Sequence, residues 1–366
     1  MSGSTEKRKM KTPAESKSYM AEIVGNESLI GQRMSAGKLL HMMDVAAGDA
    51  AFRHCENYLV TLSFDRIELL SFIRHRDYVR FDAQVIQVGR SSMVVEVTGL
   101  VKPPTEMKRT RMRSSFITMV AIHEDGTPNK TIPGMIYRSE EDLKKKKIAE
   151  ERACILAERR KKLGAVDRLK AIPLKKLKDF SKRESHSPPS DTVLEIRKRF
   201  LPRHANLLGI VFGGITIELM EELARATARQ FTGNLRMVTI AMEDVLFMKP
   251  LKISDMADMS AKVVFVGNTT LVVEVTVKAF RLFATDDGEV TNKGTFTVLN
   301  VSPEGEKMPI TRGLDLPQTD LATRKSYLKE QIKHADRTGS GQAFTAACED
   351  LKPASPQRAQ KRAKNN

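Results

Sequence analysis

The 366-residue sequence contains no Trp, few aromatic residues (5%) and only three cysteines, and these shortages narrow the class of protein. Cys55, Cys154 and Cys348 lie too far apart to share a metal-ligand spacing. We expect free thiols in a reducing compartment, and no metal site. No stretch approaches the ~20 consecutive apolar residues of a transmembrane helix, so none is expected.

The N-terminal segment also lacks the features of a secretory signal. Residues 1–13 are polar and Lys-rich, with no apolar core. The segment includes Glu6 and has no clear Arg-rich amphipathic pattern, which argues against a mitochondrial presequence. We expect a cytoplasmic protein, with a mitochondrial location as the alternative.

Positive charge is abundant, with 61 Lys and Arg against 45 Asp and Glu, a net charge of +16. Such an excess suits nucleic acid, an anionic membrane surface or a phosphate-bearing ligand. Residues 138–186 carry 17 Lys/Arg against 9 Asp/Glu, and residues 313–366 carry 10 against 6. No nucleic-acid-binding motif accompanies these two segments, so nucleic acid is not expected as a partner.

One helix-favouring segment occurs twice, at residues 37–55 and 213–228. Apolar residues cover most of the circumference of the first copy, which predicts a buried helix. An offset of 177 aligns Asp44 with Glu221. A carboxylate in an apolar helix is costly to bury without a partner, so Asp44 is the first candidate for chemistry.

Strand-favouring segments with period-two alternation follow each helix. In the first repeat they cover residues 60–67, 78–88, 93–98 and 115–122. The same pattern returns at an offset of 178, where Val88–Val97 matches Val266–Val275. The near-constant offset indicates a duplication. A long buried helix followed by an antiparallel meander predicts an α+β fold for each repeat.

Composition divides the chain into five parts. We expect a disordered N-terminal arm over 1–20, a first domain over 21–137, a charged helical linker over 138–195, a second domain over 196–312 and a basic, largely disordered tail over 313–366. Within these parts, Asp191 is a candidate N-cap for a short helix through Lys198. Residues 321–334 could form a helix in the tail.

Two segments carry a resemblance to a known family. Residues 204–214, HANLLGIVFGG, resemble the loop of hotdog-fold acyl-CoA thioesterases, in which an Asn leads through Gly-Gly into the central helix. Residues 43–48, MDVAAG, are similar to the helix carboxylate segment of that family. Residues 60–73 and the hairpin at 88–93 are similar too.

The tandem layout with a long connector resembles the double-hotdog acyl-CoA hydrolases, including the long mitochondrial type. The resemblance covers residues 21–137 and 196–312. It implies tandem hotdog domains, each a long central helix wrapped by a curved antiparallel sheet. It also implies hydrolysis of fatty acyl-CoA to free fatty acid and CoA, a step of lipid metabolism.

In this family the site lies between paired hotdog domains. The resemblance therefore implies that Asn206 of the second repeat works with Asp44 of the first. The position that matches Asn206 in the first repeat is Leu29, and Glu221 stands where the first repeat has Asp44. We expect one working site in each chain and a degenerate second site at Glu221.

The residues suggest roles within the site. Burial would raise the pKa of Asp44 and make it a better general base for water, although it could instead attack the thioester and form an anhydride. Asn206 could orient the water or donate to the carbonyl oxygen. Backbone N–H groups near Gly214 or Gly37 could form an oxyanion hole at a helix N-terminus.

Two hairpins are expected near CoA by resemblance, although ordinary turn chemistry is the alternative. Arg and hydroxyl side chains suit phosphates. No cofactor is expected beyond the CoA thioester substrate, and the repeats should pair within a chain that can form trimers. The hairpin residues are Arg90, Ser91, Ser92, Asn268, Thr269 and Thr270.

Other interpretations remain at this point. Asp44 could be a structural acid paired with His41, and Glu221 has Arg225 four residues later, as in an ordinary helical ion pair. The alternative function is a non-catalytic acyl-CoA-binding or regulatory protein that keeps both repeats. A third is a basic scaffold that acts through the linker and tail.

Overall fold

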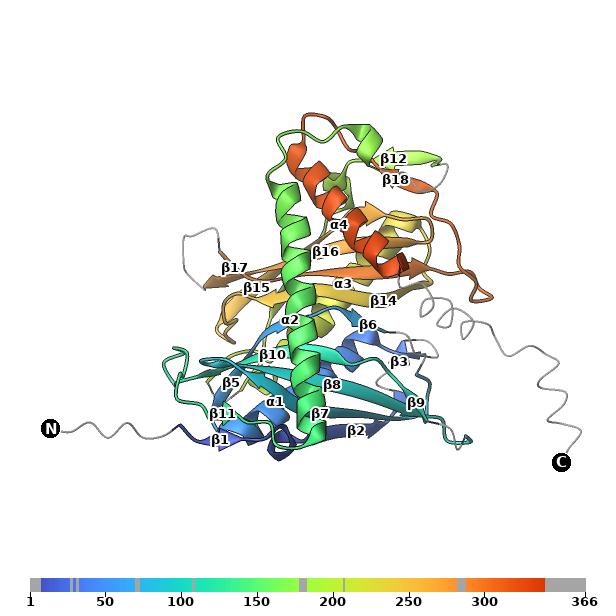
Figure 1. Ribbon diagram of the computed structural model, residues 1–366. Coiled ribbons are helices and arrows are strands. Elements are labelled where there is room, and N and C mark those ends of the chain that lie inside the picture. Colours follow the sequence, from blue (N-terminus) through green and yellow to red (C-terminus); the bar gives the residue numbers. More distant parts are fainter. Residues whose placement is uncertain are drawn as a thin grey trace, which may run out of the picture.

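A computed structural model of the chain describes residues 8–26, 29–30, 33–69, 73–106, 109–177, 183–206, 208–281 and 288–339 (Figure 1). The helices are α1 Ala36–Cys55, α2 Glu140–Asp167, α3 Gly213–Thr232 and α4 Leu321–Gly339, with 3-10 turns η1 Pro13–Ser16, η3 Leu174–Lys176, η4 Pro189–Thr192 and η5 Pro202–His204. The strands are β1 Met10–Lys11, β2 Ser18–Ile23, β3 Leu29–Ile30, β4 Arg33–Met34, β5 Tyr58–Phe64, β6 Ile67–Glu68, β7 Tyr78–Val88, β8 Ser92–Lys102, β9 Thr110–Arg111, β10 Ser115–Ile122, β11 Gly134–Met135, β12 Ser185–Ser187, β13 Leu194–Arg199, β14 Met237–Phe247, β15 Asp255–Val266, β16 Thr270–Arg281, β17 Glu289–Asn300 and β18 Arg312–Leu314.

One continuous antiparallel sheet runs through both repeats. Its strand order is β13-β15-β16-β17-β14-β5-β10-β8-β7-β2. From its outer edge to the centre, the second repeat therefore has the same order of strands as the first repeat has from the opposite edge. The repeats join where β14 pairs with β5, with Val245 opposite Phe64 and Leu246 opposite Ser63. The predicted duplication is therefore also a structural pairing of the two repeats.

The two central helices pack against each other as well as against the sheet. A Cβ atom at Gly37 would lie 2.9 Å from the Cα of Glu218, and one at Gly214 would lie 2.9 Å from the Cα of His41. The start of each helix thus lies against the second turn of the other, so α1 and α3 run antiparallel. This close approach explains the glycine near the start of each helix. Burial explains why α1 is apolar nearly all round. A fully buried side chain such as Leu40, at 0% exposure, contributes roughly 1.5–3 kcal/mol to the stability of the fold.

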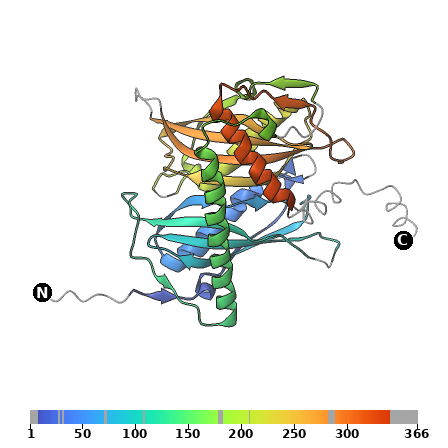
Figure 2. The same ribbon diagram turned by 45° about the horizontal axis from the view of Figure 1, so that its top comes forward.

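The linker helix α2 spans both repeats (Figure 1). It begins with a capping box of Ser139 and Asp142. Figure 2 shows α4 beside its C-terminal part, where Lys329 donates to Asp167 at 2.6 Å. Three cations of α2 pair with carboxylates on the sheet or next to it: Lys145–Glu96 at 2.6 Å, Arg152–Asp65 at 2.6 Å and Arg159–Glu243 at 2.8 Å.

The prediction of a disordered arm over residues 1–20 is wrong for residues 8–20. β2 pairs with β7 at the edge of the sheet, and β1 pairs with β11. The Ser16 hydroxyl accepts from the N–H of Val85 at 2.9 Å, and the Lys11 ammonium donates to the carbonyl of Arg53 at 2.7 Å. These polar side chains bind backbone groups of the first repeat, so the segment is held in place without an alternating apolar pattern in its sequence.

The tail predicted to be largely disordered is folded through residue 339. Arg324 is 2% exposed and donates to the carbonyls of Leu316 and Ile172, and the Tyr327 ring lies 4.9 Å from that of Phe265. Residues 340–366 lie outside the described residues.

The long helix of the linker ends at Asp167, and short 3-10 turns follow it at Leu174–Lys176 and Pro189–Thr192. The short helix predicted from Asp191 through Lys198 is wrong. Residues 194–199 form β13, which pairs with β15 as β2 pairs with β7. The sheet supplies hydrogen-bond partners that a short isolated helix would lack.

Two further expectations concern cysteines and membranes. Cys55 and Cys154 are free thiols, as predicted, and Cys348 lies outside the described residues. Among the helices of the described segments, none is long and apolar enough to cross a membrane.

The ion pairs of α2 predict a stability effect. Arg152→Met should lower the free energy of unfolding by about 3 kcal/mol, because it removes the charged partner of a largely buried Asp65. The matched control on the same helix is Lys147→Met, whose exposed pair with Glu151 spans 3.9 Å and contributes less than about 1 kcal/mol. Urea unfolding measures both, and equal losses would contradict a role for α2 beyond that of a solvated helix.

Candidate active site

Asp44 lies where the two repeats meet. Its Oδ1 accepts from the Thr61 hydroxyl of β5 at 2.8 Å, and its Oδ2 accepts from the Gly214 N–H of α3 at 2.6 Å. The residue is 6% exposed. The carboxylate is thus held by one donor from each repeat.

Burial raises the pKa of Asp44 from 3.8 to about 6, although the bonds from Thr61 and Gly214 oppose this shift. A carboxylate of this kind titrates close to neutral pH and suits a general base. The alternative pairing with His41 is wrong, since the bonds of Asp44 go to Thr61 and Gly214. The His41 Nδ1 lies instead 3.7 Å from a carboxylate oxygen of Glu218.

Thr61 is a site residue that the sequence analysis missed. A Thr in an alternating strand is an ordinary β residue, so composition and periodicity do not mark it. One signal was available, because Thr61 and Thr239 match at the offset of 178 that relates the strands. Each of these hydroxyls donates to the helix carboxylate of its own repeat.

The Gly214 N–H has a different partner from the predicted one. It donates to Asp44, so in this structure it orients the carboxylate and is not an open oxyanion donor. A helix N-terminus favours negative charge, and the nearest negative charge is this buried carboxylate. Gly213 makes the approach feasible, since a Cβ there would lie 2.9 Å from the Thr61 hydroxyl oxygen. Gly37 packs against Glu218, and its oxyanion role stays a prediction.

Asn206 closes the loop that leads into α3. Its Oδ1 accepts from the N–H groups of Leu208 and Ile210 at 3.0 and 3.1 Å. The loop is fixed to the second repeat by the bond from the Val211 N–H to the carbonyl of Leu251 at 2.8 Å. Within the described segments no acceptor takes the Asn206 Nδ2. Its catalytic role stays a prediction.

The second site is built differently around Glu221. This carboxylate is 1% exposed and accepts from the Thr239 hydroxyl and, at 3.3 Å, from the Arg225 guanidinium. Burial raises its pKa, and the Arg225 charge opposes this shift. The expected ion pair is present. Leu29 lies in β3, and its side chain is outside what the structure describes.

The two hairpins predicted to lie near CoA are hydrogen-bonded turns at the ends of strands. The Gly89 N–H donates to the Ser92 carbonyl at 2.7 Å, and Gly267 and Thr270 repeat this bond. Arg90 and Asn268 are exposed, and Ser91, Ser92 and Thr269 are half-buried. In the described part of the chain, no hydrogen bond joins either hairpin to Asp44. Their CoA role stays a prediction.

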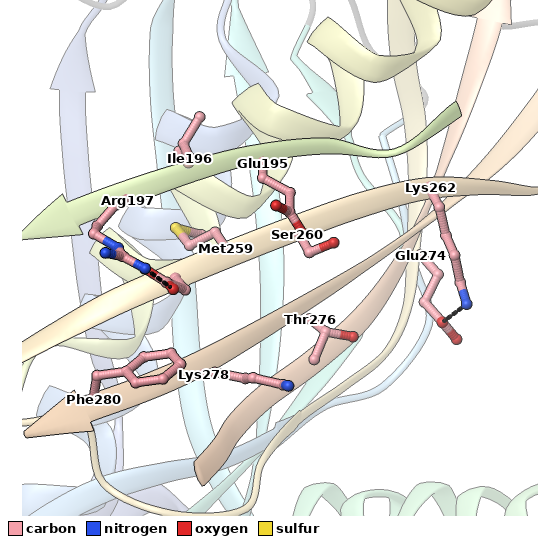
Figure 3. A pocket seen from close by; sticks show the side chains of 11 residues that line it. Glu195, Ile196, Arg197, Met259, Ser260, Lys262, Glu274, Thr276, Lys278 and Phe280 are labelled. Atoms are coloured by element: carbon pink, nitrogen blue, oxygen red, sulfur yellow. Dashed lines mark hydrogen bonds and ion pairs between the residues drawn. The ribbon is translucent and has the colours of Figure 1, made fainter. Parts of the chain in front are cut away.

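A hollow on the sheet of the second repeat is separate from this site. Figure 3 shows it between β13, β15 and β16, where Ser260 and Lys262 alternate with inward, buried neighbours. Arg197 pairs with Asp258, and Lys262 pairs with Glu274 at 3.6 Å. This hollow shares no residue with the surroundings of Asp44.

Comparison with known proteins identifies the family of this chain. The sequence model of the thioesterase superfamily matches residues 31–108 and 208–281. An uncharacterised acyl-CoA thioester hydrolase of Bacillus subtilis, YkhA, is 33% identical over 117 residues, which are 32% of this chain and 67% of the relative. An uncharacterised acyl-CoA thioester hydrolase of Zymomonas mobilis is 36% identical over 101 residues, 28% of this chain and 68% of the relative.

The fold is also found in a crystal structure of a Lactobacillus plantarum protein, provisionally named an oleoyl thioesterase. It has a TM-score of 0.50 at 10% identity and covers 78% of this chain and 97% of the other. The predicted tandem hotdog architecture is confirmed. With two matched regions, a shared fold and relatives above 30% identity, this chain belongs to the thioesterase superfamily.

Proposed function

We propose that this protein is an acyl-CoA thioesterase that hydrolyses fatty acyl-CoA to free fatty acid and CoA at Asp44. The observation that carries the proposal is a buried carboxylate with a pKa near 6, held by Thr61 and by the Gly214 N–H of the other repeat. Family membership supports the reaction class. The names of the Bacillus and Zymomonas relatives support the substrate class.

The reaction needs a base or nucleophile, a polarised carbonyl and a water. In the general-base route, Asp44 takes a proton as the water oxygen bonds to the thioester carbon. The C–S bond then breaks, and the CoA thiolate receives that proton. In the nucleophilic route, Asp44 displaces the thiolate, which takes a proton from solvent, and water then hydrolyses the anhydride. A pKa near 6 leaves Asp44 mostly ionised at neutral pH and still basic enough for the first route.

Polar donors around Asp44 would stabilise the developing oxyanion. The Gly214 N–H is taken by Asp44 itself, so the N-terminus of α3 would contribute through the positive potential of its helix dipole. The Oδ1 of Asn206 is used by its own loop, which leaves the amide Nδ2 as the group to bind the carbonyl oxygen or the water.

The second site does not perform this chemistry in our proposal. Arg225 lies 3.3 Å from Glu221 and neutralises it, whereas the residue four positions after Asp44 is Gly48. A carboxylate with a guanidinium partner is a weaker base than one without. Each chain then has one working site.

The proposal also covers the ligand, the assembly and the compartment of the enzyme. The substrate is the only CoA compound required, with no other cofactor, and CoA runs near the hairpins at Arg90 and Asn268. Chains assemble as trimers of paired repeats. The protein acts in the cytoplasm, with mitochondria as the alternative compartment.

Acyl-CoA hydrolysis by purified protein, followed through the released thiol, tests the function. Asp44→Asn should lower kcat/KM by roughly 10²–10⁴, the range for loss of a general base. Glu221→Gln is the matched control in the second repeat and should change kcat/KM less than threefold. Wild type that binds acyl-CoA without turning it over at any chain length would support the non-catalytic alternative instead.

The bond from Thr61 predicts a shift in the pH profile. This bond lowers the pKa of Asp44, so Thr61→Val should move the midpoint of kcat/KM against pH upward from about 6. Thr239→Val removes the equivalent hydroxyl from Glu221 and should leave the midpoint unchanged. Equal shifts in both variants would remove Asp44 as the titrating group.

The raised pKa of Asp44 also has a consequence for stability. Because ionisation costs more in the folded protein, the stability tied to protonated Asp44 is complete below pH 4 and is lost as the pH rises through 6. The advantage of Asp44→Asn over wild type should therefore grow by about 3 kcal/mol between pH 4 and pH 7.

Urea unfolding across this pH range measures the effect. Asp125→Asn is the control: hydrogen bonds from Thr127 lower the pKa of Asp125, so its effect on stability changes mainly below pH 4 and should stay nearly constant between pH 4 and pH 7. A pH-independent difference between Asp44→Asn and wild type would show that Asp44 titrates normally.

A further inference from the structure

One side of α1 differs in chemistry from the equivalent side of α3. Spacings of four, three and four residues place the four positions of each set along one side of a helix. In α3 every one of these positions is charged, whereas in α1 none carries a fixed charge. The α1 stripe is His41, Val45, Gly48 and Phe52, and its counterpart at an offset of 177 is Glu218, Glu222, Arg225 and Arg229.

The α1 stripe is open to solvent beyond Asp44. Val45 is 43% exposed and Phe52 is 52% exposed, although α1 is otherwise largely buried. The antiparallel packing explains this exposure. Asp44 touches Gly214, the second residue of α3, so the part of α1 after Asp44 extends past the start of α3.

Gly48 has no structural reason to be glycine. A glycine weakens the interior of a helix. A Cβ at position 48 would meet only the Met119 Cε, at the ordinary contact distance of 3.9 Å. Gly37 and Gly214 differ, because a Cβ at either would lie 2.9 Å from a backbone atom of the other helix. In the second repeat the position of Gly48 holds Arg225, which fills the space and pairs with the carboxylate.

Gly48 also lies next to the candidate catalytic group. It is one helical turn after Asp44, so the two residues are neighbours on the surface of α1. Val45 and Phe52 continue from Gly48 as an apolar surface. An acyl chain whose carbonyl lies beside Asp44 would thus pass the missing side chain of Gly48 first and then contact the apolar side chains of Val45 and Phe52.

We propose that the acyl chain of the thioester crosses α1 at Gly48 and lies along the α1 stripe toward Phe52. The missing side chain at position 48 gives the chain passage, and Val45 and Phe52 remove its methylenes from water. The side chain at position 48 then sets the acyl length that the enzyme accepts. This inference rests on the proposed thioesterase function and assigns the acyl path within it.

Chain-length profiles test the proposal. Rates on butyryl-, octanoyl-, lauroyl- and palmitoyl-CoA give kcat/KM for wild type and Gly48→Leu. The ratio of palmitoyl-CoA to butyryl-CoA should fall at least tenfold in Gly48→Leu, because leucine closes the passage. Gly164→Leu is the matched control: Gly164 is also inside a helix, and a Cβ there meets nothing within 4 Å. Its profile should equal that of wild type.

A second variant keeps the test decisive if Gly48→Leu does not fold. Phe52→Arg introduces, at an exposed position, the charge that Arg229 has at the equivalent position of the second repeat. It should lower kcat/KM for palmitoyl-CoA at least threefold and leave kcat/KM for butyryl-CoA unchanged. Leu143→Arg, at a 55% exposed position on α2, is its control. Light scattering on each variant reports its oligomeric state.

The outcomes separate the two proposals. Wild type that is inert on every acyl-CoA defeats the proposed function. Active wild type with unchanged profiles in folded Gly48→Leu and in Phe52→Arg overturns the acyl path alone, as does an equal loss at all chain lengths. Dissociation of Phe52→Arg with an unchanged profile also overturns it and assigns the stripe to a contact between copies.

Discussion

The hydrogen bond from the Gly214 N–H to Asp44 depends on the pairing of the repeats and holds the carboxylate to which we assign the chemistry. It requires α1 and α3 to approach until a side chain at Gly37 or Gly214 would strike the opposite backbone. The same approach removes Asp44 from water and raises its pKa. If the helices separated, the carboxylate would lose a donor and regain solvent. Its basicity is therefore a property of the paired repeats and not of α1 alone.

The rest of the chain keeps this pairing in place. The sheet joins the repeats where β14 pairs with β5 at Phe64 and Ser63 and with β6 at Ile67 and Glu68, which together are a short seam. The linker helix α2 adds to it, because Arg152 binds a carboxylate of the first repeat and Arg159 binds one of the second. The charged linker, which composition marks as a solvated helix, thus fixes the geometry that Asp44 needs.

Sequence reasoning reached the features that repeat with a period and missed those that depend on single contacts. The strands followed from their period-two alternation, and the two helices and the match of Asp44 with Glu221 followed from the 177-residue offset. Thr61 was missed because its hydroxyl gains meaning only when β5 lies against α1. The arm was missed because it is held by strand pairing with β7 and β11 and by single bonds such as that of Ser16 to the Val85 N–H, which leave no periodic pattern in the sequence. The partner of the Gly214 N–H was missed because it lies 170 residues away in the chain.

Joining both repeats in one chain permits an asymmetry that a symmetric dimer cannot have. In such a dimer, one residue would occupy both equivalents of position 48. Here Gly48 follows Asp44, and Arg225 follows Glu221. A guanidinium one turn after Asp44 would favour the ionised carboxylate and lower its pKa, which would weaken it as a base. The ion pair in α3 instead satisfies a buried carboxylate to which our proposal assigns no such task. Duplication thus lets one repeat keep an unneutralised base while the other stabilises the same position with charge.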